Sequence, residues 1–398
     1  REGEYYLLKS DDYGATWDDI TKALEDVDKD DDIEELLQVA TDWVDPDFVA
    51  VALWDDDELR VYFSTDGGST FIDAGEVDDG GNSLDTVSDL AVSYESGGKR
   101  DIAIGGTGSA ILFRCTVTGD SPGAWKDVTT SASGWDDEGA LNSSLVTDII
   151  FSPSWASDKT ILVTTVAPAA DDATVYLQSG SWGISPGWNE KSTLGIKAVP
   201  IKVNVPLPLW LWLADFDARG IAGITLPSDY NSRNTDQRLL WVWVNYYNIS
   251  PREPRCDIMR VDNDSAGLVG PLGQVQEGKI WLTNISYQGT IAEGKAIAGV
   301  LGTGTHTPRN YHELLTACCE GVQVYRNDGI RNMDICCERW SKACKPPTGQ
   351  TAMAVSYVGD SKAYAVALQG WMDYDEGAWS FTTDDGDTWN QLSLIDTY

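Results

Sequence analysis

The stretch Ser10-Asp-Asp-Tyr-Gly-Ala-Thr-Trp17 has two further copies in the chain, Ser64-Thr-Asp-Gly-Gly-Ser-Thr-Phe71 and Thr382-Thr-Asp-Asp-Gly-Asp-Thr-Trp389. All three read Ser/Thr-x-Asp-x-Gly-x-Thr-aromatic. An Asp side chain can accept hydrogen bonds from the backbone of a turn, Gly can take a positive φ, and Thr can hold the exit of the turn. Short apolar or alternating runs flank the copies, so each copy predicts a β-hairpin with a tight turn.

This pattern resembles the Asp box, or BNR repeat, of sialidases, xyloglucanases, sortilin-type receptors and photosystem assembly factors, all of which are β-propellers. The resemblance implies a propeller fold and a structural role for the motif, since fold similarity alone does not define a function. The residues that carry it are Ser10, Asp12, Gly14, Thr16 and Trp17, then Ser64, Asp66, Gly68, Thr70 and Phe71, and finally Thr382, Asp384, Gly386, Thr388 and Trp389.

Weaker copies extend the repeat. Trp17, Phe71 and Trp125 follow one another at 54-residue intervals, which a β-sandwich would not produce. Counting the weaker copies gives seven outer hairpins. Six inner hairpins of apolar strands lie between them, at Leu36–Leu53, Asp89–Gly105, Asp148–Val166, Ile221–Val244, Asn284–Leu301 and Met353–Leu368.

An inner and an outer hairpin together form a four-stranded blade, and 398 residues over seven units give about 57 residues each. We therefore predict an all-β fold: one seven-bladed β-propeller domain spanning residues 1–398, with insertions near residues 196–216, 245–257 and 303–320. A six-bladed ring with an extra hairpin is the alternative.

The first blade is expected to be incomplete, because the sequence opens on an outer hairpin at Tyr5. Unpaired strand edges expose backbone donors and acceptors and favour pairing with another chain. Two explanations stay open: the sequence is a piece of a longer polypeptide, or a neighbouring molecule completes the blade by strand addition.

The charge excludes some classes of partner. The chain has 28 Lys and Arg against 63 Asp and Glu, a net charge of −35. Such a chain lacks the clustered cations that bind nucleic acid, and its field repels anionic membranes. The longest apolar stretch, residues 203–214, contains two prolines and is shorter than the roughly 20 residues of a membrane span. We expect no nucleic-acid partner and no direct membrane insertion.

The cysteines favour an extracellular location. Disulfides in an oxidising compartment explain the crowded cysteines better than a metal site with His306 and His312, because no CxxC spacing is present. The disulfide candidates are Cys256, Cys318, Cys319, Cys336, Cys337 and Cys344, and Cys115 is the expected free thiol. Four Asn-x-Ser triplets are candidate glycosylation sites, at Asn142, Asn248, Asn263 and Asn284.

No catalytic group can be assigned. The arginine motif that sialidases carry before their first Asp box is absent, since only Arg1 precedes Ser10 among the arginines. Xyloglucanase-like enzymes use two carboxylates, and the sequence does not single out a pair. The acidic run with Asp28, Asp30 and Asp32 is a candidate Ca²⁺ site, although a solvated loop explains it as well. Trp135 and Trp182 lie beside glycines and are candidates for stacking on a sugar ring.

Two functional hypotheses follow. The first is a non-catalytic extracellular propeller that acts as a structural or docking unit of a cell-surface layer, filament or other assembly, through self-association. The second is a carbohydrate-binding or glycoside-hydrolysing propeller with a glycan as partner. The missing catalytic signature, the cysteines and the incomplete first blade favour the first.

Overall fold

The computed structural model describes residues 5–27, 35–42, 44–55, 58–129, 134–135, 142–168, 173–182, 187–189, 198–205, 222–234, 237–238, 240–248, 253–261, 280–281, 300–306, 311–317, 324–328, 340–349, 351–359, 362–369 and 376–396. Two short helices occur among these residues, α1 (Thr21–Glu25) and α2 (Trp155–Asp158). The remaining regular structure is antiparallel β-sheet. This confirms the all-β prediction.

The first three large sheets contain the N-terminal half of the described chain. One consists of β3 (Glu35–Thr41), β4 (Val49–Asp55), β5 (Glu58–Ser64) and β6 (Ile72–Glu76). The next contains β7 (Leu84–Val92), β8 (Lys99–Gly108), β9 (Leu112–Thr118), β10 (Ser121–Pro122) and β11 (Lys126–Asp127). The third contains β12 (Leu145–Phe151), β13 (Thr160–Pro168), β14 (Ala173–Ser181), β15 (Gly187–Trp188) and β16 (Val199–Val205).

Three further sheets follow in chain order. They are β17 (Ala222–Thr225), β18 (Leu240–Asn248), β19 (Glu253–Val261) and β20 (Ile280–Trp281); β21 (Val300–His306), β22 (Tyr311–Ala317), β23 (Val324–Asp328) and β24 (Trp340–Lys342); and β25 (Thr351–Gly359), β26 (Lys362–Gln369), β27 (Glu376–Thr382) and β28 (Asn390–Asp396). Each sheet is a meander in which strands adjacent in sequence pair, with β10, β11, β15 and β16 sharing the outer positions of the two five-stranded sheets.

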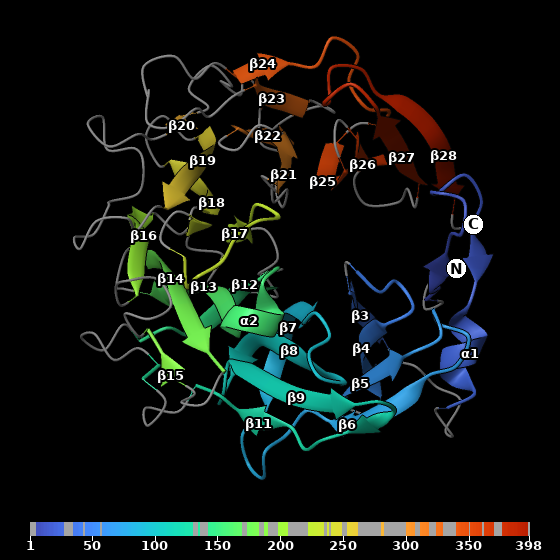
Figure 1. Cartoon of the computed structure of the whole chain (residues 1–398), viewed down its shortest axis with the longest axis vertical. Coiled ribbons are helices and arrows are strands. Elements are labelled where there is room, and N and C mark those ends of the chain that lie inside the picture. The colour runs from blue at the N-terminus through green and yellow to red at the C-terminus, as the bar shows by residue number, and fades with distance from the viewer. Residues whose placement is uncertain are drawn as a thin grey trace.

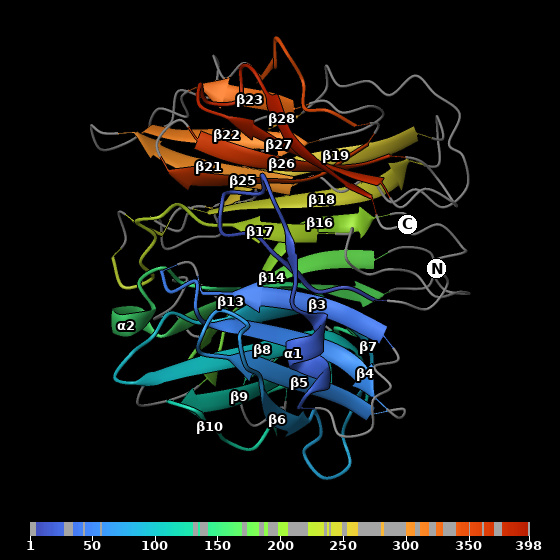
Figure 2. The same ribbon diagram turned by 90° about the vertical axis from the view of Figure 1, so that its right-hand side faces the viewer.

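The sheets are arranged around a common centre like the blades of a propeller (Figure 1). The first strand of each sheet lies innermost, and these inner strands contact one another in the order β3, β7, β12, β17, β21, β25. A separate two-stranded sheet, β1 (Leu8–Lys9) and β2 (Asp18–Asp19), crosses between the β25–β28 sheet and the β3–β6 sheet (Figure 2).

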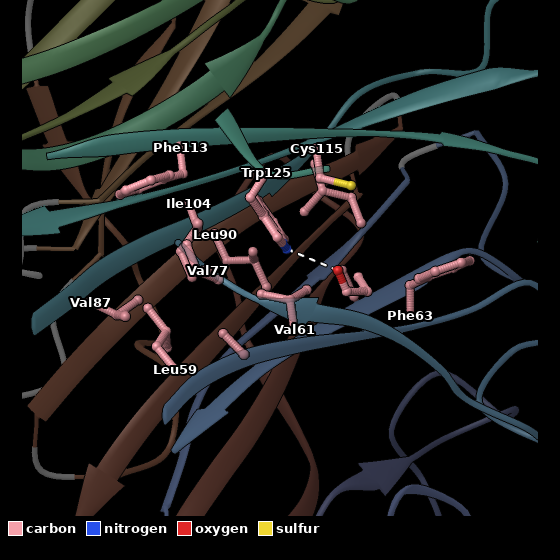
Figure 3. Close-up of a cluster of buried hydrophobic side chains, with 14 of the residues drawn as sticks. Leu59, Val61, Phe63, Val77, Val87, Leu90, Ile104, Phe113, Cys115 and Trp125 are labelled. Atoms are coloured by element: carbon pink, nitrogen blue, oxygen red, sulfur yellow. Dashed lines mark hydrogen bonds between the residues drawn. The ribbon is translucent and has the colours of Figure 1, made fainter. Parts of the chain in front are cut away.

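The hydrophobic core lies between neighbouring sheets. Between the β3–β6 sheet and the β7–β11 sheet, Val61 and Phe63 are buried in one cluster with Leu90 and Ile104 (Figure 3). Trp125, the aromatic residue of a weaker copy of the repeat, is also buried there and donates a hydrogen bond from Nε1 to the carbonyl of Ala74 at 3.0 Å. Burial of whole aliphatic and aromatic side chains, at roughly 25 cal/mol per Å² of apolar area, is the main force that holds the sheets together.

Two expectations about chain segments need correction. The regions near 196–216, 245–257 and 303–320 were expected to be insertions, but β16, the ends of β18 and β19, and the pair β21–β22 lie within them. An inner hairpin was expected at Asn284–Leu301, whereas the structure forms it from β21 and β22; residues 282–299 lie outside the described residues.

Candidate functional site

The three repeat turns have one conformation. Tyr13, Gly67 and Asp385 occupy the same position and have φ values of 64°, 69° and 57°. The motif glycine follows with φ of 86° at Gly14, and the values at the other two motif glycines are 83° and 81°. Two successive left-handed residues make this turn tight, and glycine adopts the second one without the steric cost that a side chain would bring.

The same hydrogen bonds hold each turn. In the second copy, Ser64 Oγ donates to Asp66 Oδ1 at 2.8 Å, and the backbone N–H of Thr70 donates to the same oxygen at 2.8 Å. Thr70 Oγ1 donates to Asp66 Oδ2 at 2.8 Å, and the Gly68 N–H donates to Ser64 Oγ at 2.8 Å. The first and third copies repeat this set around Asp12 and Asp384, with distances of 2.6 to 3.1 Å.

These carboxylates accept hydrogen bonds that stabilise their own turns. All three Asp side chains are exposed, and their oxygens accept bonds from within their own turn. Hydrogen bonds from the Thr16 side chain and backbone lower the pKa of Asp12. Partial desolvation acts in the opposite direction at Asp66, but the Thr70 hydrogen bonds still lower its pKa. A carboxylate held in its charged form is a hydrogen-bond acceptor and a poor general acid.

A second set of polar side chains lies on the inner strands. β3, β7 and β12 each carry a bulge at the same register, and the residue after the bulge is Gln38, Asp89 or Asp148. Each of these side chains bonds to the backbone of the next inner strand. Gln38 Nε2 donates to the Ser88 carbonyl at 3.0 Å, Asp89 Oδ2 accepts from the Ile149 N–H at 2.6 Å, and Asp148 Oδ2 accepts from the Ile224 N–H at 2.5 Å.

Asp89 and Asp148 also form a carboxyl pair. Both side chains are partly buried, and a hydrogen bond joins them. Desolvation by the surrounding sheets raises the pKa of Asp89 well above its ordinary value, and the charge of Asp148 raises it further. Desolvation also raises the pKa of Asp148, against the opposing effect of the Ile224 N–H. Desolvation and the proximity of the two carboxyls therefore disfavour ionisation of both at once. Because their oxygens are occupied by neighbouring strands, the pair serves to join blades.

The residue that follows Gln38, Asp89 or Asp148 shows how well the neighbouring sheet covers each inner strand. Leu90 on β7 and Ile149 on β12 are 5% and 4% exposed, because the preceding sheet covers them. The equivalent residue on β3 is Val39, which is 48% exposed. Two positions further on, Thr41 is exposed while Val92 is buried. This face of β3 therefore lacks the cover that other inner strands receive.

The last sheet shows the complementary difference. On the β3–β6 sheet, Ala50, Ala52, Val61 and Phe63 form the face toward β7, and all are 0% exposed. The equivalent residues on the β25–β28 sheet, counted from the repeat turn, are Tyr364, Val366, Trp379 and Phe381. Tyr364 pairs with Phe381 as Ala50 pairs with Phe63, and Val366 pairs with Trp379 as Ala52 pairs with Val61. All four are only partly buried. An apolar and aromatic face thus remains partly exposed.

The β1–β2 hairpin covers only part of these two faces. Toward the last sheet, the Trp17 ring meets Trp379 edge-on at 5.4 Å, and Trp17 Nε1 donates to Ser393 Oγ at 3.2 Å. A Cβ on Gly14 would lie 2.5 Å from Trp379 Nε1, so glycine is required at this contact. Toward the other sheet, Leu7 is buried in one cluster with Leu53. The hairpin therefore bridges both sheets at the outside of the ring.

We call the remaining partly exposed surface the half-blade site. It consists of Val39 and Thr41 on β3, of Tyr364, Val366, Trp379 and Phe381 on the last sheet, and of the edge of β1 that does not pair with β2. Leu7 bonds toward β2 through its carbonyl, which accepts from the Ile20 N–H at 2.9 Å. Because strand residues alternate in direction, the backbone groups of Leu8 point to the other edge, into this site.

The two candidate sugar-stacking tryptophans were assigned wrongly. Trp135 and Trp182 are 6% and 9% exposed and pack edge-on against Trp188, with ring centroids 4.6 and 6.2 Å apart. The Arg114 guanidinium covers the Trp182 ring at 4.2 Å. Neighbouring glycines indicated exposed loops, but contacts between sheets bury both rings.

Some of the remaining cysteine, Ca²⁺ and glycosylation candidates lie within the described residues and others lie outside them. Cys115 is a buried free thiol, whereas Cys344 is exposed. Cys318, Cys319, Cys336 and Cys337, the Ca²⁺ candidates Asp28, Asp30 and Asp32, and the triplets at Asn263 and Asn284 lie outside the described residues. Cys256 and Asn248 lie on β19 and β18, and Asn142 is exposed with φ of 51°.

The described residues contain neither a cluster of possible metal ligands nor a helix long enough to cross a membrane. No group of three or more His, Cys, Asp or Glu side chains in the described part of the chain is placed to hold a metal ion. Among the same residues, none of the helices has the length and apolar character needed to span a bilayer.

The sequence contains a recognisable signal for the carboxyls of the inner strands, but no role was assigned to them from the sequence. Val87-Ser-Asp-Leu-Ala-Val92 and Val146-Thr-Asp-Ile-Ile-Phe151 both place one Asp within an apolar strand. These segments were predicted as the beginnings of inner hairpins, and no role was assigned to the carboxyls. A charged residue at the same point of two apolar strands is a recognisable mark of a buried polar contact.

Comparisons with known proteins identify no family. No protein-family model matches the chain, and no curated protein sequence matches it. Among solved structures, it is similar to the GH74 enzyme of Niastella koreensis, with 14% identity, 96% of this chain and 42% of that chain covered, and a TM-score of 0.36. This chain therefore spans less than half of that enzyme.

Other solved structures are comparable in length. An α-L-arabinofuranosidase of Fusarium graminearum has 9% identity, with 91% and 93% of the two chains covered and a TM-score of 0.44. A PL25 ulvan lyase has 10% identity, 88% and 81% coverage and a TM-score of 0.45. The β-propeller domain of Vanderwaltozyma polyspora Nup133 has 12% identity, 71% and 68% coverage and a TM-score of 0.39.

Proposed function

We propose that this chain is a non-catalytic extracellular propeller, with seven blades, that acts as a structural or docking unit of a larger surface assembly. The seventh blade is the one that begins with the β1–β2 hairpin, which occupies the position of the two outer strands. The repeat turn supports this position, because it connects β1 to β2 as it connects β5 to β6 and β27 to β28.

The observation that carries the proposal is the half-blade site. A ring that works alone buries the apolar faces between its blades, because exposing a large apolar side chain costs roughly 1.5–3 kcal/mol. Val39 is about half exposed where its equivalents are almost fully buried, and four apolar residues of the last sheet are partly exposed where theirs are fully buried. Contiguous apolar surface of this kind marks a site of protein association.

Two further features support the proposal. The net charge of −35 keeps a protein soluble and suppresses nonspecific aggregation, so association is confined to a defined apolar surface. The carboxylates characterised above are engaged with the backbone, either in the repeat turns or between inner strands. The cysteine pattern and the exposed Asn142 are consistent with an oxidising, extracellular location.

The proposal is tested by the state of the protein purified from its source under non-reducing conditions. Sedimentation velocity and negative-stain images should show rings joined in a repeated assembly. A homogeneous population of single rings would refute the proposal. A screen for glycan binding and hydrolysis should give no signal, and release of sugar from a polysaccharide would support the carbohydrate hypothesis instead.

A further inference from the structure

We infer that the half-blade site takes a β-hairpin from a partner polypeptide, which adds two strands to β1 and completes the inner half of the blade. This inference rests on the proposed function and names the partner that the docking unit binds. It uses the mode of recognition in which main-chain hydrogen bonds give affinity and alternating side chains give specificity.

The other blades define the shape of the occupant. β5 is the counterpart of β1, and it pairs antiparallel with β4, which in turn pairs antiparallel with β3. Both β3 and β4 are seven residues long. The occupant is therefore a hairpin with strands of about this length, whose first partner in the sheet is the open edge of β1. Its backbone would bond to the N–H and C=O of Leu8, which point away from β2.

The two walls define the side chains of the occupant. One face of the hairpin would pack on Val39 and Thr41, as Ala50 and Ala52 pack on the sheet that follows them. The opposite face would pack on Tyr364 and Trp379. Both faces must therefore be apolar, so each strand of the hairpin is expected to be a near-continuous apolar run. The site continues the series of interfaces between inner strands that joins β3 through β25.

Charge and pairing favour a partner over a second copy. The net charge of −35 repels another acidic chain, so neutral or basic ends are expected on the hairpin. In the described part of a second copy, the inner strand pairs are already hydrogen-bonded within their own sheets. A second copy would have to break one of these sheets to supply the hairpin.

The test uses the full 398-residue chain and a synthetic hairpin. The probe peptide has the sequence of residues 35–55, the inner strands of the following sheet, with lysines added at both ends. A control peptide carries Ala50→Lys and Ala52→Lys, which place charge on the face that packs against the wall. The readout is hydrogen exchange at the Leu8 amide. We expect the probe to slow this exchange at least tenfold and the control peptide to leave it unchanged.

Variants of the full chain separate binding at the site from nonspecific adhesion. Val39→Lys adds charge to the wall at a position that is already about half exposed and should abolish the protection by the probe. Val44→Lys makes the same change at a residue that is 76% exposed and is not part of the wall, and it should preserve the protection.

Each other outcome overturns the inference. If the probe fails to slow exchange at Leu8, the site does not accept a hairpin, even if native particles are assembled. If exchange at Leu8 slows with protein concentration alone, a second copy occupies the site. If Val44→Lys abolishes protection as fully as Val39→Lys, the peptide binds elsewhere. The state of the native particles tests the proposed function separately, so the two failures can be distinguished.

Discussion

The carboxyl pair on the inner strands makes a prediction about stability and pH. The substitution Asp89→Asn replaces a carboxyl whose pKa is raised by burial with a side chain that carries no charge at any pH. Asn can still donate to Asp148 through Nδ2 and accept the Ile149 N–H through Oδ1. The contacts at 2.6 and 2.5 Å that join the strands can therefore be kept.

The direction of the pKa shift decides whether the free energy of unfolding rises or falls with pH. The pKa of Asp89 is raised in the folded state, so the folded protein retains a proton that the unfolded chain loses above about pH 4. Below that pH both states are protonated and the pair has no cost. As the pH rises, the free energy of unfolding of the wild type falls by about 1.4 kcal/mol per pH unit for one retained proton. The fall continues until the pH reaches the raised pKa of Asp89 in the folded state.

The assay is urea denaturation of wild type and Asp89→Asn at intervals from pH 4 to pH 7. The difference between the two proteins isolates one site from the other carboxylates, and we expect the variant to gain on the wild type as the pH rises. Asp78→Asn is the control of opposite sign, because the N–H groups of Gly81 and Gly80 lower the pKa of Asp78. The wild type should gain on that variant only as the pH rises through about 4, where the carboxyl of the unfolded chain ionises, so this control is followed from about pH 3 to pH 5. Parallel curves for wild type and Asp89→Asn from pH 4 to pH 7 would refute the raised pKa of Asp89.

Three further predictions concern the turns and the core. Asp66→Ala removes the acceptor of three hydrogen bonds in an exposed turn, so the free energy of unfolding should fall by about 1–2 kcal/mol; a fall of less than about 0.3 kcal/mol would contradict the turn lock. Gly14→Ala should cost about 2 kcal/mol or more, because the left-handed φ of 86° is combined with a 2.5 Å approach to Trp379. Its control, Gly97→Ala, has φ of 66° and open space around the new Cβ, and should cost only about 1 kcal/mol; equal losses would exclude the Trp379 contact as a cause. Burial raises the pKa of Cys115 to about 11, so a thiol reagent at pH 8 should leave it unlabelled until urea unfolds the chain, and rapid labelling of the native protein would contradict its burial.

The repeat turns could be predicted from sequence because their bonds are local. Asp66 bonds to residues two and four positions away, so the motif contains both donors and acceptor. The alternating strands around each motif then gave the antiparallel sheets. By contrast, Asp89 bonds to a residue 60 positions away and Asp148 to one 76 positions away. These partners are defined only when the sheets pack around their common centre.

Burial was predicted well within a strand and poorly in connections. Trp241 and Trp243 alternate with valine in one strand, a pattern typical of packing between sheets, and both are buried. Trp135 and Trp182 were expected at the surface because glycine adjoins them, yet tertiary contacts with Trp188 cover both rings. The half-blade site could not be located from sequence, since it depends on how much of Val39 the neighbouring sheets leave exposed.

A cryo-electron microscopy reconstruction of the particle from its native source tests the central claim most directly. The account predicts density for two additional antiparallel strands between β3 and the β25–β28 sheet, hydrogen-bonded to β1 and belonging to a partner polypeptide, in rings joined to their neighbours. Isolated rings in which solvent lies against Val39 and Trp379 would contradict it.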